Sequence, residues 1–143
     1  MKFKLKIEYI IKDYIFNMEH FQLFLQELRD NDPSLQRLYI RNYIFLQQIN
    51  LNNEDGITTF AEALKTNTTL QQLNLADNRI DEKGATQLAE ALKGNNSIQK
   101  LDLGENDLAD NGTKQLAEAL KTNNSLQELD LYNNIIGNGD ECE

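Results

Sequence analysis

Residues 70–97 read LQQLNLADNRIDEKGATQLAEALKGNNS, and residues 98–125 read IQKLDLGENDLADNGTKQLAEALKTNNS. The two stretches are equal in length, and the second follows the first without a gap. The opening phrase returns a third time as LQELDLYNNII at residues 126–136. Self-similarity at a fixed period of this length indicates a solenoid, in which each repeat is one structural unit stacked on the last.

Each repeat changes its hydrophobic period halfway along. The phrase LxxLxL places leucines such as Leu73 and Leu75 two residues apart, as a short half-buried strand requires. The second half instead has apolar residues at i, i+3, i+4 and i+7, as in Ala85, Leu88, Ala89 and Leu92. That spacing predicts an amphipathic helix. Strands joined by helical crossovers lie parallel, so the repeats predict a parallel sheet with helices on one side.

The pattern LxxLxLxxNxI followed by GxxxLAxALKxN closely resembles the leucine-rich repeat in its 28-residue, ribonuclease-inhibitor-like form, which also occurs in NOD-like receptors and in the GTPase-activating protein of Ran. The resemblance covers residues 46–136 well and residues 21–40 loosely. It implies an α/β leucine-rich-repeat solenoid: a short curved horseshoe with parallel strands on the concave side and helices on the convex side. It also implies that Asn78, Asn106 and Asn134 bond to the backbone of a neighbouring turn, a role suited to an amide with both donor and acceptor.

The repeat pattern divides the rest of the chain. Residues 1–34 are expected to be an N-terminal segment with a capping helix at about 18–29. Alternating residues at 3–9 have the period of a half-buried strand, and this stretch either caps the stack or is disordered; neither a signal peptide nor a membrane span is indicated. Because Leu35 lies only 11 residues before Leu46, residues 35–45 are expected to form a degenerate, helix-less repeat, which either pairs irregularly or leaves a notch on the convex side. The expected repeats are then 46–69, 70–97, 98–125 and a partial 126–136, followed by an acidic tail at 137–143.

Composition limits the possible functions. With 14 basic and 23 acidic residues, the net charge of −9 at pH 7 disfavours nucleic acid and anionic membrane as partners and favours a basic protein surface. The single cysteine, Cys142, excludes an intrachain disulfide and favours an intracellular, cytoplasmic location. His20 is the only histidine and lies far along the chain from Cys142. No metal-binding, phosphate-binding or nucleophilic motif occurs, so we expect no cofactor, no metal and no enzymatic activity.

The solvent-facing strand positions and the turns that follow them predict a protein-binding surface on the concave sheet. Amides dominate the early repeats of this surface and carboxylates the later ones, which suits a basic partner, with one tyrosine as an aromatic anchor. An alternative is that a solvated strand face is simply polar. The predicted partner-binding residues are Gln72, Asn74, Asp77, Lys100, Asp102, Glu105, Glu128, Asp130, Tyr132 and Asn133.

Other functions stay open from the sequence alone. No helical segment follows residues 126–136, so this uncapped repeat could self-associate, or the chain could be a fragment of a larger sensor or effector array. Similarity to the Ran activator raises the alternative of a regulator of a small GTPase, although a shared fold does not fix function.

Overall fold

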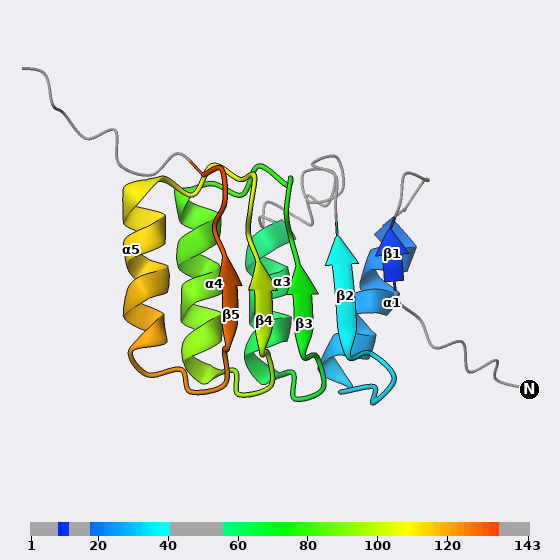
Figure 1. Cartoon of the computed structure of the whole chain (residues 1–143). Coiled ribbons are helices and arrows are strands. Elements are labelled where there is room, and N and C mark those ends of the chain that lie inside the picture. Colours follow the sequence, from blue (N-terminus) through cyan, green and yellow to red (C-terminus); the bar gives the residue numbers. More distant parts are fainter. Residues whose placement is uncertain (1–8, 12–17, 41–55, 135–143) are drawn as a thin grey trace, which may run out of the picture.

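The structure is a computed structural model of the whole chain and describes residues 9–11, 18–40 and 56–134 (Figure 1). The elements are β1 (Tyr9–Ile11), α1 (Met18–Arg29), β2 (Arg37–Ile40), α3 (Gly56–Thr66), β3 (Gln72–Asn74), α4 (Glu82–Gly94), β4 (Lys100–Asp102), α5 (Ala109–Leu120) and β5 (Glu128–Asp130). The five strands are parallel and adjoin one another in chain order. Helices α3, α4 and α5 stand side by side behind them (Figure 1). This arrangement is the α/β leucine-rich-repeat solenoid that the sequence predicts.

The register of the sheet follows the sequence repeat. Gln72 pairs with Lys100, and Lys100 pairs with Glu128, so each step across β3, β4 and β5 is one full sequence repeat. Because equivalent residues of successive repeats face one another, every solvent-facing position forms a column across the sheet.

The first described repeat departs from the expected boundaries. The sequence analysis placed a strand near residues 46–51 and a helix-less unit at 35–45; residues 41–55 lie outside the described residues. In the structure, Arg37 pairs directly with Gln72, so β2 adjoins β3 and no strand stands between them. The strand that pairs with β3 on this side is therefore β2, and α3 crosses between the two strands. The unit that begins with β2 therefore has a helix, α3, because the chain between β2 and β3 is long enough for a helical crossover. The expected notch involves residues 41–55 and stays a prediction.

The N-terminal part adds a strand and a helix. A helix was expected at about 18–29, and α1 spans Met18–Arg29 and contacts α3. Residues 1–8 of the expected N-terminal strand lie outside the described residues, while β1 pairs in parallel with β2. Leu25 and Leu28 of α1 are buried in the same core as the repeats.

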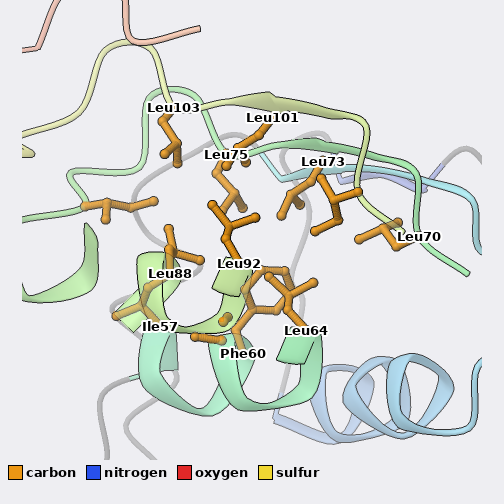
Figure 2. Packing of buried hydrophobic residues seen from close by; sticks show 14 of the residues in the cluster. Ile57, Phe60, Leu64, Leu70, Leu73, Leu75, Leu88, Leu92, Leu101 and Leu103 are labelled. Carbon is orange, nitrogen blue, oxygen red and sulfur yellow. The ribbon is translucent and has the colours of Figure 1, made fainter. Parts of the chain in front are cut away.

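The core lies between the sheet and the helices. Figure 2 shows the strand leucines, such as Leu73 and Leu101, directed toward Phe60, Leu88 and Leu92 of the helices. All five side chains are nearly fully buried. Burying a leucine contributes roughly 1.5–3 kcal/mol, and because the leucines come from successive repeats, each repeat depends on its neighbours for this burial.

Two columns of buried asparagines join the repeats. Asn106 accepts hydrogen bonds from the N–H groups of Asn78 (3.1 Å) and Ile80 (2.9 Å) and donates to the Leu75 carbonyl (3.0 Å), as the family resemblance implied. A second column lies where the helices end: Asn95 donates to the carbonyls of Leu64 and Asn67, and Asn123 donates to those of Leu92 and Asn95.

The second column explains three N-x-S/T sequences. Asn67, Asn95 and Asn123 are buried, and the amide nitrogen of each donates to backbone carbonyls of the preceding repeat or helix. A glycan on any of these nitrogens would remove those hydrogen bonds and require space inside the stack. These sequences therefore belong to the repeat architecture.

Candidate protein-binding face

The sheet has one face without helices, which we call the open sheet face and define by the outward-facing residues of β2–β5. Its first column contains Arg37, Gln72, Lys100 and Glu128, and its second contains Tyr39, Asn74, Asp102 and Asp130. Each of these side chains is exposed or half-buried, whereas the alternate leucines of β2, β3 and β4 are buried. The strand alternation of the sequence thus places six of the ten predicted residues on one surface.

The other four predicted residues lie on turns at the carboxyl ends of the strands. Asp77, Glu105 and Asn133 are exposed and adopt φ angles of 57°, 54° and 53°. In this left-handed region, aspartate and asparagine are more common than most residues. Tyr132 precedes Asn133 and is 73% exposed. These turns continue the open sheet face at its edge.

Lysine and glutamate are paired in the first column. The Lys100 Nζ atom lies 2.6 Å from the Glu128 Oε1 atom, and both side chains are largely exposed. An exposed pair of this kind contributes roughly 0–1 kcal/mol, so it orients the two side chains more than it stabilises the fold. The uncompensated negative charge on β4 and β5 is therefore concentrated in the second column.

The carboxylates of the second column also hold the turns together. Asp102 accepts from the Gly104 N–H at 2.9 Å, and Asp130 accepts from the Tyr132 N–H at 2.8 Å. Asn74 accepts from the Ala76 N–H in the same way, and its amide nitrogen donates to Asp102 Oδ2 at 2.6 Å. The sequence reasoning treated these residues only as binding groups. An Asp or Asn side chain often accepts the backbone N–H two residues further along a turn. This known pattern could have shown that these residues also stabilise the turns.

Sequence reasoning missed Arg37 and Tyr39. The predicted face began with the expected repeat at 46–69, whose strand positions lie outside the described residues, so β2 was not counted. Leu35, Leu38 and Ile40 do follow the LxxLxL spacing, and that signal could have placed Arg37 and Tyr39 on the sheet face. The face therefore has a basic side chain at the β2 side and acidic side chains at the β5 side.

Within the part of the chain that the structure describes, no group of three or more His, Cys, Asp or Glu side chains is arranged to hold a metal ion. No helix there is long and apolar enough to cross a bilayer. The space lined by Leu64, Leu73, Leu88 and Leu92 has no room for a water molecule. The main surface feature of the described residues is the polar open sheet face, whose side chains are held by short hydrogen bonds.

Fold and surface together define a leucine-rich-repeat domain with an open polar sheet face. Comparison with known families makes the class specific: residues 17–143 match the family model described as TMOD/LMOD Leucine-rich domain, and the chain belongs to this family.

Two solved structures illustrate the relationship. The structure titled "Leiomodin-1 Actin-Binding Site 2 (ABS2)" is 30% identical with a TM-score of 0.69, and the match covers 80% of this chain and 62% of that one. The chain therefore spans less than two thirds of the leiomodin structure. The C-terminal domain of tropomodulin from Caenorhabditis elegans, 18% identical with a TM-score of 0.55 and coverages of 77% and 81%, shows the shared fold alone. Comparison with curated proteins finds no match.

Proposed function

We propose that this chain is an actin-binding protein-interaction module. The observation that carries the proposal is the 30% identity, over four fifths of the chain, to a leiomodin domain whose title names it an actin-binding site. Family membership over residues 17–143 supports the same assignment. The sequence analysis expected a protein partner, and we propose that this partner is actin.

The open sheet face and its turns are the proposed contact surface. Their side chains are held in place before binding: Asn74, Asp102 and Asp130 each accept a turn N–H, and Lys100 is paired with Glu128. A surface with fixed side chains loses less conformational entropy on binding. The acidic second column on β4 and β5 favours a basic region of the partner, and Tyr132 offers an exposed aromatic ring.

Several finer properties belong to the same proposal. We propose binding without catalysis, and the match to a family described as a leucine-rich domain supports this. We also assign the repeats to the ribonuclease-inhibitor-like subtype, supported by the match between sheet register and sequence repeat across β3, β4 and β5. Because actin is an intracellular partner, the proposed location is intracellular. The alternative of a GTPase regulator gains no support from the family match.

Co-sedimentation with actin filaments and a fluorescence titration of monomeric actin test the proposal. The informative variant is D102N/E128Q/D130N, which removes three negative charges while the amide oxygens at positions 102 and 130 can still accept the turn hydrogen bonds. The matched control is E62Q/E90Q/E118Q, which removes three exposed carboxylates from the helices. We expect the wild-type chain and the control to bind actin alike, and the sheet-face variant to bind about five- to tenfold more weakly.

The outcomes separate two claims. Absence of wild-type binding to either form of actin would refute the function. Wild-type binding that both triple variants retain would leave actin binding intact and refute the sheet face as its surface.

A further inference from the structure

Asn111 and Gly112 form an Asn–Gly pair in the first turn of α5. The equivalent residues of α4 are Lys83 and Gly84, and within the described ranges no other asparagine is followed by glycine. The Asn111 side chain is exposed to solvent. In an Asn–Gly pair the backbone nitrogen of the glycine reaches the asparagine side-chain amide more easily than in other pairs, because glycine has no side chain and few conformational restrictions.

The first turn of α5 is held less firmly than the first turn of α4. In α4, the side chain of the N-cap residue Asp81 accepts from the Gly84 N–H at 2.8 Å. Ala109 occupies the equivalent position in α5, and the α5 N-cap makes no side-chain hydrogen bond. Ala109 also has a φ of 54°, which is unfavourable for a residue with a Cβ. Because the Gly112 N–H lacks the side-chain acceptor that the Gly84 N–H has, the first turn of α5 opens more readily.

The same pair lies at the contact between α4 and α5, which stand side by side (Figure 1). The Asn111 Nδ2 atom donates to the Glu82 Oε1 atom of α4 at 2.7 Å. Gly112 is buried, and a Cβ atom added to it would lie 2.8 Å from the Ala85 Cβ atom and 3.3 Å from the Glu82 Cα atom. A chemical change at either residue therefore acts directly on the contact between the two helices.

We propose that Asn111 is a deamidation site, at which the folded chain changes its covalent structure without an enzyme. When the first turn of α5 opens, solvent hydroxide takes the proton of the Gly112 N–H, and the nitrogen attacks the Asn111 Cγ atom. The new nitrogen–carbon bond closes a succinimide ring. The bond from Cγ to Nδ2 breaks, and the amide nitrogen leaves as ammonia after taking a proton from water, which restores the hydroxide. Water then adds to one of the two ring carbonyls and opens the ring, which leaves aspartate or isoaspartate at position 111.

Both products weaken the contact between α4 and α5. Each replaces a neutral amide by a carboxylate, so the hydrogen bond to Glu82 becomes a contact between two like charges. Isoaspartate also inserts a methylene group into the main chain beside Gly112, where Ala85 leaves no space for an added carbon. Deamidation thus loosens α5 from the stack. The proposal does not depend on actin being the partner of the open sheet face.

Mass spectrometry of the full chain, incubated at neutral and at mildly alkaline pH, tests the proposal. Trypsin releases residues 101–114 as one peptide, which contains Asn111 and, as an internal control, the buried Asn106. We expect conversion at Asn111 and none at Asn106, with a higher rate at alkaline pH because hydroxide starts the reaction. The rate in the folded chain should lie within about tenfold of the rate in urea, since fraying helix ends open at little cost in free energy. Conversion of Asn111 in urea alone, or equal conversion of the two asparagines in the folded chain, would overturn the proposal.

Two sets of variants test the cause and the consequence, with folding checked by circular dichroism. Ala109→Asp supplies the residue that caps α4 and should slow conversion about fivefold, whereas Ala117→Asp adds the same charge to an exposed position of α5 and should not. Equal rates in these two variants would overturn the role of the missing cap. Asn111→Asp imitates one product and should lower the urea midpoint more in the wild-type background than in a Glu82→Gln background. An equal decrease in both backgrounds would overturn the loosening of α5 through Glu82.

Discussion

Replacing Asn106 by alanine removes the most connected side chain of the asparagine column. Its amide oxygen accepts from two backbone N–H groups, those of Asn78 and Ile80, at 3.1 and 2.9 Å. Its amide nitrogen donates to the carbonyls of Leu75, Leu103 and Gly104 at 3.0 to 3.1 Å. The side chain is only 4% exposed, so water has little access to replace these bonds.

The size of the effect follows from the groups that are left behind. An unsatisfied buried donor costs roughly 1–3 kcal/mol, and Asn106→Ala creates two, while the three carbonyls lose one of their donors. We therefore expect a loss of about 3–5 kcal/mol in the free energy of unfolding. Asn134→Ala is the matched control, because the Asn134 side chain is half-buried, donates to the Leu103 and Leu131 carbonyls at 2.9 Å, and accepts from the Leu108 N–H at the longer distance of 3.4 Å. There water can take over, and a loss of about 1 kcal/mol or less is expected.

Urea unfolding followed by circular dichroism measures both variants, with the free energy taken from linear extrapolation. A loss below about 1 kcal/mol for Asn106→Ala, or an equal loss for Asn134→Ala, would refute the reasoning that burial of the bonded backbone groups decides the cost.

Three further predictions concern the helices. Gly112→Ala should lower stability by about 1–3 kcal/mol in urea unfolding, because its new methyl carbon would lie 2.8 Å from the Ala85 Cβ atom of α4. Ala109→Gly should raise stability by about 1 kcal/mol in the same assay, since Ala109 begins α5 with a φ of 54°, which is unfavourable for any residue with a Cβ. Hydrogen bonding and Coulombic attraction by Lys121 lower the pKa of Glu118, so Lys121→Met should raise that pKa toward its ordinary value in an NMR titration.

Each of these has a result that would count against it. Gly94→Ala is the control for Gly112→Ala. The nearest atoms to the new methyl carbon at position 94 all belong to Lys65, with the flexible side chain at 3.5 Å and the carbonyl oxygen at 3.9 Å, so stability should not fall appreciably. Unchanged stability of Ala109→Gly would show that the left-handed conformation is not strained. For the ion pair, a depressed pKa means that the stabilisation is present above the unfolded-state pKa and is lost as pH falls through the folded-state value. A Glu118 titration that Lys121→Met leaves unchanged would remove that explanation.

The sequence by itself determined the stack from residue 70 onward. Its two complete units follow each other at a fixed period, and in each the leucine spacing changes from the period of a strand to that of a helix. Such patterns are local, so they specify β3, α4, β4, α5 and β5 without knowledge of distant contacts. Equal spacing also put Asp102 and Asp130 side by side, because it makes equivalent residues neighbours. The Asn106 hydrogen bonds were implied by the resemblance to the leucine-rich repeat.

The tertiary structure decided the features that depend on which segments of the chain pack against each other. The LxxLxL phrase at Leu35 and the similar one at Leu46 compete for one place beside β3, and only the pairing of Arg37 with Gln72 settles that β2 occupies it. The turn hydrogen bonds of Asp102 and Asp130 depend on the path of the backbone after each strand. Finally, Leu92 and Leu120 occupy the same position of their repeats yet differ in exposure, because burial is set by the neighbouring repeat and not by the residue itself.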